Sequence, residues 1–282
     1  MPISLCVRPD EARNQVRAAK RRGSKIGVVP TMGALHQGHL SLVKACASEC
    51  DFTVVTIFVN PTQFGPSEDF DQYPRDLDKD LSQLDGLGVD MVFAPNPGEI
   101  YHPAHSTFVQ PPEVAEVLEG ELRPGHFRGV TTVVLKLLQI VPADVAFFGQ
   151  KDYQQTRVIQ DMCRDLDLPV SIQVCATIRE PDGLALSSRN AYLSADQRER
   201  SLSLPNALKL AVEMSREEKT KPDEIRAEMI RLLNAAPVDK IEYVAIVDPV
   251  TLQPLERIVP GAMALIAAFV GGTRLIDNVR LG

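Results

Sequence analysis

The sequence predicts an α/β protein with a doubly wound parallel sheet in residues 1–176 and a smaller C-terminal α+β domain in residues 177–282. In the first part of the chain, short apolar runs alternate with amphipathic helical stretches, which is typical of parallel strands joined by covering helices. After Cys175 the order changes to helices followed by strands, which favours a separate α+β domain. A length of 282 residues suits one large domain, or a large and a smaller one.

The strands expected in the first domain are short, apolar and rich in β-branched residues. They are residues 25–29, 52–59, 90–94, 144–148 and 170–176. Helical patterns fall between them, at 40–48, 76–87, 131–141 and 153–166. Repeated strand–helix–strand units predict a doubly wound sheet. Each crossover is right-handed, so connections that run in the two directions along the sheet place their helices on opposite faces.

The second domain is expected to begin with two helices, at 195–219 and 223–235, and to end in three strands, at 242–247, 263–270 and 275–279. One long polar loop, residues 60–74, follows the second strand of the first domain. Ligands of open α/β sheets bind at the carboxyl ends of the strands, so this loop is a candidate binding segment.

Composition excludes several classes of protein. Apolar residues make up 44% and charged residues 24%, which is ordinary for a globular protein. The net charge of −7 argues against a general nucleic-acid surface, which needs a basic stripe. A basic cluster at Arg17, Lys20, Arg21 and Arg22 is best interpreted as a solvated helix face. No apolar run is long enough to span a membrane and no secretory signal is evident, so we expect a cytoplasmic protein.

The five cysteines contain no CxxC pair, and we interpret them as free thiols packed as small apolar groups. Cys46 and Cys50 are four residues apart on a predicted helix, where they could share a metal or a bridge.

The strongest chemical signal is the segment Val29–His39, VPTMGALHQGH. It begins where a strand ends and enters a helix, with His36 and His39 on one face of the first turn. Gly38 leaves room for a ligand near the backbone, and the helix start supplies N–H donors and a positive dipole end. The pattern predicts a phosphate-binding site.

Three plainer interpretations of this segment stay open. The histidines could form a zinc pair, although no third ligand stands at a convincing spacing. They could be ordinary surface residues, and Gly33 and Gly38 could serve only the turn. The phosphate interpretation is favoured because histidines, glycine and helix start all suit one anion.

Two further loops also contain side chains that can bind an anion. Gly149, Lys151 and Asp152 follow a strand and open a helix; Lys151 offers a cation and Asp152 suits an N-cap. Ser187, Ser188 and Arg189 combine two hydroxyls with a guanidinium. Capping alone would explain Asp152, and such serine-rich loops are common as plain turns.

The HxGH element resembles the nucleotidylyltransferase superfamily, whose domains are Rossmann-like. The wider set of motifs, in the same order over almost the whole chain, resembles the pantothenate synthetase family. The blocks that carry this resemblance are PTMGALHQGH, IFVNPTQF, YPRDLDKD, RPGHFRGV, FFGQKDYQQ, GLALSSRN and RLIDN. That family condenses pantoate with β-alanine through a pantoyl adenylate, uses ATP, and releases AMP and pyrophosphate.

The resemblance implies roles for particular residues. Catalysis would rest on His39, His36, Lys151 and Arg189, with His39 as proton donor. ATP would be bound by Pro30, Thr31, Met32, Gly33, Ala34, Leu35, His36, Gln37, Gly38, His39, Gly149, Gln150, Lys151, Asp152, Ile178, Leu186, Ser187, Ser188 and Arg189. Pantoate would be held by Gln63 and Gln155, and Gln63 would also lie near the β-alanine site. Further candidates around these pockets are Asn60, Tyr73, Arg123 and His126. Asp80 would lie near Mg²⁺, and the protein would be a homodimer.

The reaction itself demands positive charge, because both the attacking carboxylate and ATP are anions. It also demands a dry site for the reactive anhydride, and the C-terminal domain with Ser187–Arg189 is the expected lid. An adenylyltransferase that keeps the nucleotide in its product and a nucleotide sensor without activity are the rival interpretations. A tRNA synthetase is less compatible with a short, acidic chain.

Overall fold

The structure, a computed structural model, describes residues 3–66, 68–217 and 221–282. They form two compact units. The first contains the described residues up to Gly149 together with Gln154–Ala176, and the second contains Gln150–Tyr153 with Thr177–Gly282. The short segment Gln150–Tyr153 therefore packs with the second unit although it directly follows the last residue of a strand in the first.

The first unit is built on a six-stranded sheet in the order β1-β4-β3-β2-β5-β6, in which every neighbouring pair is parallel. The chain leaves β2 toward β3 on one side, while β5 pairs with β2 on the other side. This reversal is the topological switch point at which such sheets bind ligands. The strands are β1 (Ser4–Cys6), β2 (Ile26–Thr31), β3 (Phe52–Ile57), β4 (Met91–Phe93), β5 (Val145–Gly149) and β6 (Ser171–Cys175).

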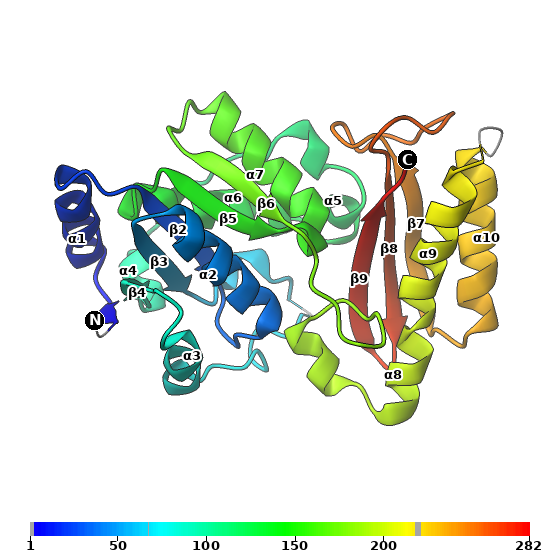
Figure 1. Cartoon of the computed structure of the whole chain (residues 1–282), viewed down its shortest axis with the longest axis horizontal. Helices are drawn as coiled ribbons and strands as arrows, with labels where there is room; N and C mark the ends of the chain where they lie inside the picture. Colours follow the sequence, from blue (N-terminus) through cyan, green and yellow to red (C-terminus); the bar gives the residue numbers. More distant parts are fainter. Residues whose placement is uncertain (1–2, 67, 218–220) are drawn as a thin grey trace. The chain divides into compact units, whose positions relative to one another are not determined.

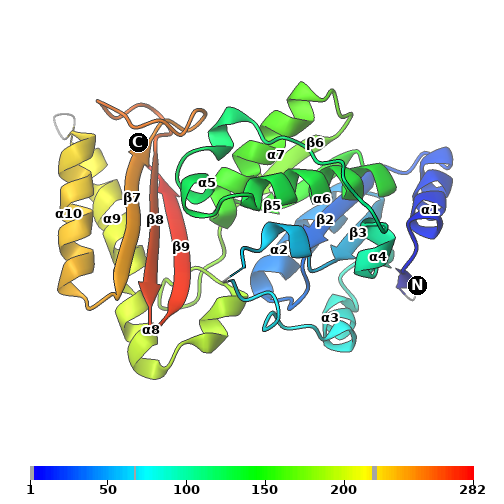
Figure 2. The same ribbon diagram turned by 180° about the vertical axis from the view of Figure 1, so that it is seen from behind.

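Helices cover both faces of this sheet: α2 and α3 lie on one face, and α6 and α7 lie on the other (Figures 1 and 2). Buried side chains of α2, α3 and the sheet form one apolar cluster that includes Val29, Val43, Leu84 and Phe147. The helices are α1 (Pro9–Arg21), α2 (Gln37–Glu49), α3 (Leu77–Leu84), α4 (Pro97–Ile100), α5 (Glu119–Leu122), α6 (His126–Ile140) and α7 (Tyr153–Asp165), with single 3₁₀ turns η1 (Pro61–Gln63), η2 (Glu113–Ala115) and η3 (Gln150–Asp152).

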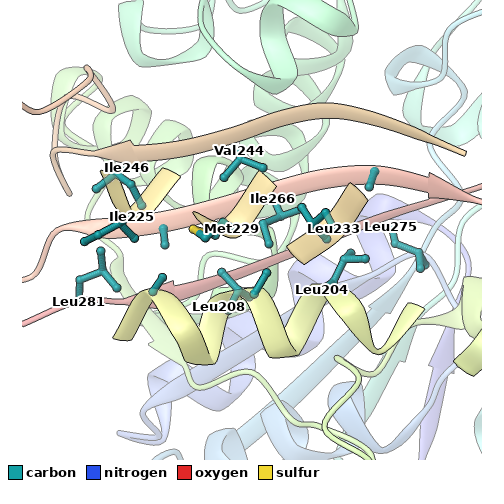
Figure 3. Close-up of a cluster of buried hydrophobic side chains, with 14 of the residues drawn as sticks. Leu204, Leu208, Ile225, Met229, Leu233, Val244, Ile246, Ile266, Leu275 and Leu281 are labelled. Atoms are coloured by element: carbon teal, nitrogen blue, oxygen red, sulfur yellow. The ribbon is translucent and has the colours of Figure 1, made fainter. Parts of the chain in front are cut away.

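The second unit is a three-stranded antiparallel sheet, β7-β8-β9, with two helices packed on one face. Figure 3 shows the core between them, where Leu208 and Met229 from the helices meet Ile266 from the central strand. The elements are η4 (Ser188–Tyr192), α8 (Ala195–Ser201), α9 (Ser203–Ser215), α10 (Pro222–Ala235), β7 (Lys240–Val247), β8 (Met263–Val270) and β9 (Thr273–Arg280).

The predicted fold class is confirmed: a parallel α/β sheet is followed by a small antiparallel sheet with helices. One prediction was incomplete, because the strand expected first, at 25–29, is the second. β1 and α1 precede it, and a strand of three residues is too short to show an alternating pattern.

A second prediction was wrong: the helix expected over 195–219 is divided at Leu202 into α8 and α9. Pro205 lies in the first turn of α9. Because proline has no N–H to donate to the carbonyl four residues earlier, it fits a helix start and not a helix interior. The predicted end of that helix, Lys219, lies outside the described residues.

The cysteine and basic-cluster predictions agree with the structure. All five cysteines are free thiols. Arg17, Arg21 and Arg22 are exposed, on or just after α1, while the Lys20 Nζ is 2.7 Å from the Asp144 carboxylate. Over the part of the chain that the structure describes, each helix is too short or too polar to cross a bilayer.

Candidate functional site

The turn between β2 and α2 is held in an unusual backbone conformation. Gly33 and Ala34 both have positive φ, 78° and 49°, and a non-glycine residue in that region is strained. The hydroxyl of Thr31 accepts the Gly33 N–H at 3.2 Å and donates to the Thr56 carbonyl at 2.7 Å, which ties the turn to β3. Thr31 thus supports the turn, and its hydroxyl is buried within it.

Asp80, from α3, closes the same turn. Its Oδ2 accepts the Ala34 N–H at 3.0 Å, and its Oδ1 accepts the Leu35 N–H at 2.8 Å. The residue is 2% exposed. Burial raises the pKa of the Asp80 carboxyl above its usual value, although the two backbone hydrogen bonds oppose that shift. This carboxylate therefore stabilises the strained backbone just before His36.

His36 and His39 cap the start of α2 and each other. The Nδ1 of His36 accepts the Gly38 N–H at 3.1 Å, and the Nδ1 of His39 accepts the His36 N–H at 3.4 Å. The two ring centroids are 4.1 Å apart. An Nδ1 that accepts a hydrogen bond carries no proton, so each neutral ring holds its proton on Nε2.

This geometry gives the helix start two imidazole N–H donors, one from each ring. Each Nε2–H can donate to an oxygen of an anion, and a protonated ring would add a full positive charge. The first-turn N–H groups of α2 add the positive end of the helix dipole. The element suits phosphate oxygens, as the sequence predicts.

A second segment of the first unit, η1, is joined to this turn by one side-chain hydrogen bond. Gln63 donates its Nε2 to the Met32 Sδ at 3.3 Å, and its Oε1 accepts from the Asn60 Nδ2 at 2.9 Å. Asn60 is 1% exposed, and its Oδ1 accepts from the Tyr101 hydroxyl at 2.8 Å. The structure therefore brings Met32, Gln63 and Asn60 together, with Asn60 fixing the Gln63 amide.

Helix α6 packs against the backbone of η1 and supports Gln63. A Cβ on Gly129 would collide with the Thr62 carbonyl and with the backbone nitrogen of Gln63, so only glycine permits this approach. The Nδ1 of His126 lies 2.8 Å from the Gln63 carbonyl oxygen. Since that oxygen can only accept, the His126 proton is on Nδ1.

His126 is kept neutral by its surroundings. Burial, together with the charge of Arg123, lowers its pKa from 6.5 to about 4. Its unprotonated Nε2 accepts from an Arg123 nitrogen at 3.2 Å. Arg123 also makes two hydrogen bonds to the Glu68 carboxylate, at 2.7 and 2.6 Å. The Arg123 charge is thus already paired with a carboxylate in the first unit.

Two other predicted substrate residues are less closely tied to this group. Tyr73 is buried, with its ring 6.1 Å from that of Phe64. Gln155 is half-buried on α7. In the part of the chain that the structure describes, its side chain makes no hydrogen bond to Asn60, Gln63 or His126. The structure does not bring Gln155 into that hydrogen-bonded set.

Of the predicted ATP-binding residues outside the segment Pro30–His39, all except Gly149 at the end of β5 belong to the second unit. Gln150, Lys151 and Asp152 form η3. Ile178 and Leu186 are paired, with the Leu186 N–H donating to the Ile178 carbonyl at 3.0 Å. The hydroxyl of Ser187 accepts the Arg189 N–H at 3.3 Å and caps η4, which begins at Ser188.

Sequence reasoning assigned no role to several residues that organise these segments. Tyr101 and Glu68 fix Asn60 and Arg123, and Gly129 admits η1 against α6. Asp277 and Asn278 contact the segments that carry Lys151 and Ile178. For this last pair the sequence held a signal, since two adjacent polar residues stand between the apolar residues Leu275–Ile276 and Val279. Nothing in the polar loop singles out Glu68.

The predicted contact between Asp80 and Mg²⁺ depends on which side chains could bind a metal ion. Among the described residues, no three His, Cys, Asp or Glu side chains gather to hold a metal ion. Mg²⁺ commonly keeps several waters and binds substrate phosphates, so no protein cage is required. Both Asp80 oxygens already accept backbone N–H groups, and a contact between Asp80 and Mg²⁺ stays a prediction.

A doubly wound parallel sheet with two histidines at the helix start beyond its switch-point strand defines an α/β protein with a candidate phosphate-binding site. A family model for pantoate-beta-alanine ligase matches residues 4–280, and the chain belongs to that family. It is therefore a ligase, and the reaction of the family is the ATP-dependent condensation of pantoate with β-alanine.

Relatives agree in sequence and in structure. The chain is 53% identical over 269 residues to a pantothenate synthetase from Moorella thermoacetica, covering 95% of each chain. A crystal structure of pantothenate synthetase from Thermus thermophilus superposes with a TM-score of 0.93 at 42% identity, covering 98% of this chain and 99% of that one. A ligase from Francisella tularensis, complexed with beta-gamma ATP and beta-alanine, matches with a TM-score of 0.81 at 35% identity over 99% and 97% of the two chains.

Proposed function

We propose that the chain makes pantothenate in two steps, with His36, His39, Lys151 and Arg189 as its catalytic residues. In the first step the pantoate carboxylate attacks the α-phosphorus of ATP, and pyrophosphate leaves. In the second step the amine of β-alanine attacks the acyl carbon of the pantoyl adenylate, AMP leaves with the electron pair of the broken acyl–oxygen bond, and the new amide nitrogen releases a proton.

The observation that carries the proposal is the tautomer of the two histidines. Both Nδ1 atoms accept backbone hydrogen bonds, so both Nε2–H groups are donors at the start of α2. As pyrophosphate leaves, negative charge grows on its bridging oxygen, and a donor placed there stabilises the transition state more than the ground state. His39 fits the proton donor, with His36 on a neighbouring phosphate oxygen.

Lys151 and Arg189 are proposed to neutralise the phosphates further. Arginine can bind phosphate oxygens with two parallel N–H groups, and lysine acts as a point charge. Ser187 and Ser188 would add hydroxyl donors. Asp152 would contact the ribose, Gly149 would allow close approach of the nucleotide, and the backbone at Ile178 would face the adenine.

Pantoate is proposed to bind at the Gln63 amide, with Gln155 as its second amide partner. Amides pair with hydroxyl and carboxylate groups without adding charge. Asn60 and His126 fix Gln63 from its side chain and its carbonyl. Because Arg123 is paired with Glu68, we assign it, with Tyr73, to supporting this site.

The adenylate must be protected from water until the amine attacks, and the amine must be neutral. We propose that residues 1–176 form the nucleotide-binding domain and that residues 177–282 act as its lid. Mg²⁺ would accompany ATP and offset its phosphate charge. We further propose a homodimer in the cytoplasm. Sedimentation of the purified protein would test the dimer, and activity after removal of Mg²⁺ by a chelator would test the ion.

The first experiment is to measure AMP release by purified protein with ATP and Mg²⁺, with pantoate and β-alanine added singly and together. We expect rapid AMP release only with both acids, and exchange of labelled pyrophosphate into ATP with pantoate alone. Pyrophosphate release without free AMP would instead indicate adenylyl transfer to a retained product. No reaction in any combination would contradict the proposed function.

A further inference from the structure

The edge strand β9 of the second unit carries two adjacent buried polar residues that the reaction chemistry does not use. Asp277 and Asn278 are each 3% exposed. They follow apolar residues in a strand that pairs along its length with β8. Burying a carboxylate and an amide is costly unless each is well hydrogen-bonded, so their partners indicate what they are for.

Asn278 holds the backbone of η3. Its Nδ2 donates to the Lys151 carbonyl at 2.8 Å and to the Gln150 carbonyl at 3.0 Å. Its Oδ1 accepts from the Gln150 Nε2 at 3.4 Å. Both amide hydrogens are therefore used on two consecutive carbonyls, which fixes the backbone on both sides of the Lys151 nitrogen. A single side chain sets where the lysine leaves the main chain.

Asp277 holds a different segment. Its two carboxylate oxygens accept from the Arg179 guanidinium at 2.6 and 2.9 Å, and Arg179 also donates to the Gly183 carbonyl at 3.0 Å. This bidentate pair is nearly buried on its acidic side and has the geometry of a strong ion pair. It anchors the hairpin of residues 178–186, whose two arms pair at Arg179 and Ala185.

The hairpin leads directly into the serine–arginine segment. Its last backbone hydrogen bond joins Leu186 to Ile178. Immediately after it, Asn190 donates its Nδ2 to the Ala185 carbonyl at 3.1 Å and to the Glu180 carboxylate at 2.8 Å. The residues on both sides of 187–189, Leu186 and Asn190, are therefore hydrogen-bonded to the hairpin.

We infer that Asp277 and Asn278 are positioning residues that set Lys151 and Ser187–Arg189 in register with each other for ATP. Successive side chains of a strand point to opposite faces, so adjacent residues of one edge strand can hold two segments at once. The Asp277 Oδ1 also accepts the Asn278 N–H at 2.7 Å, which links the two anchors. The inference rests on the proposed assignment of Lys151 and Arg189 to the phosphates.

The test compares Asn278→Ala, Asn278→Asp and Asp277→Asn with Lys151→Ala, using full-length protein and both AMP release and pyrophosphate exchange. We expect Asn278→Ala to lower kcat/KM for ATP by about 100-fold, the scale of a displaced catalytic group. Asn278→Asp should be at least as damaging, because a carboxylate would face two carbonyl oxygens. KM for β-alanine should change by less than about twofold, since the side-chain amide of Asn278 contacts the segment that is assigned to ATP.

A double variant separates positioning from general support of the fold. If Asn278 acts through Lys151, then Asn278→Ala should add little loss to a Lys151→Ala enzyme. Thr273→Ala, which truncates another buried polar residue of β9, is the matched control and should leave kcat/KM for ATP within about twofold of wild type. Multiplied losses in the double variant, or an equal loss in the control, would overturn the inference.

The outcomes also distinguish this inference from the proposed function. A Lys151→Ala enzyme with unchanged ATP kinetics would contradict the phosphate role of Lys151 and, with it, the inference. A large loss in Lys151→Ala with normal kinetics in Asn278→Ala would contradict the inference alone. Thermal unfolding of each variant establishes that folded protein is compared in every case.

Discussion

His36 and His39 are capped by their neighbours in the sequence, whereas the segments with Lys151 and Arg189 are held by a strand far along the chain. The histidine caps span two and three residues. The hydrogen bond from Asn278 to the Lys151 carbonyl spans 127 residues, and the pair between Arg179 and Asp277 spans 98.

This difference separates two ways to build a phosphate site. A capped helix start forms as soon as the local chain is helical, because its donors are the first residues of that helix. The segments held by β9 acquire their geometry only when the second unit has folded. We therefore expect substitutions near the histidines to alter chemistry directly, and substitutions in β9 to act at a distance.

The largest expected effect is at the capped turn itself. His39→Ala should lower kcat by about 100-fold or more, the scale for loss of a transition-state donor, while KM for pantoate changes little. Steady-state kinetics of AMP release measure both constants. Truncation of the exposed His102 is the control and should have no effect. A loss seen only in KM for pantoate would contradict the role of His39.

A slightly smaller effect is expected at Asp80, which holds the turn from helix α3. Asp80→Ala leaves the Ala34 and Leu35 N–H groups without their acceptor, at about 1–3 kcal/mol for each unsatisfied donor. We expect a fall in kcat/KM for ATP of about 10- to 100-fold as the strained turn relaxes. Chemical denaturation and ATP kinetics measure the two effects. Asp78→Ala, at an exposed position of the same helix, should reproduce neither.

A third segment, the 3₁₀ turn with Gln63, is held by the buried side chain of His126. The pKa of His126 is lowered to about 4 in the folded protein, so the unfolded chain binds a proton more readily. Its contribution to stability is complete above pH 6.5 and is lost as the pH falls toward 4, by on the order of 2–3 kcal/mol.

His126→Asn keeps a donor for the Gln63 carbonyl and does not titrate, so its unfolding free energy should fall less steeply between pH 6.5 and 4 than that of wild type. Urea denaturation across this range measures the difference. His102→Asn, an exposed histidine, should follow the wild-type curve. Parallel curves for His126→Asn and wild type would show that His126 titrates normally.

The smallest effect is expected at Ile178, a residue that is proposed to contact ATP only through its backbone. Ile178 is 37% exposed, and Ile178→Val removes one methylene without altering a backbone group. We expect kcat and KM for ATP to stay within about twofold of wild type, since surface substitutions away from special contacts are nearly neutral. A large rise in KM for ATP would indicate that the side chain itself contacts the nucleotide.

Much of the architecture could be read from residue pattern. Buried strands such as those expected at 52–59 and 263–270 are apolar runs bounded by polar or small residues, and both are strands in the structure. The failures have local causes: β1 is too short to show a period, and the division of the helix at Leu202 depends on the single residue Pro205.

The candidate site also has features that follow from the local sequence and features that do not. The HxGH element predicted a capped helix start with two histidines on one face, because residues within one turn determine that geometry. The partners of Asn60, Arg123 and Lys151 could not be predicted, since hydrogen bonds across 41 to 127 residues depend on how the elements pack.

The sequence by itself determined the α/β class, the family and the chemical types of the candidate site residues. Only the tertiary structure decided that Asp80 closes the histidine turn, that Arg123 is paired with Glu68, and that Asn278 fixes the backbone of Lys151. The physical reason is that periodicity and capping are properties of neighbouring residues, whereas the partner of a buried polar group is chosen by the whole fold.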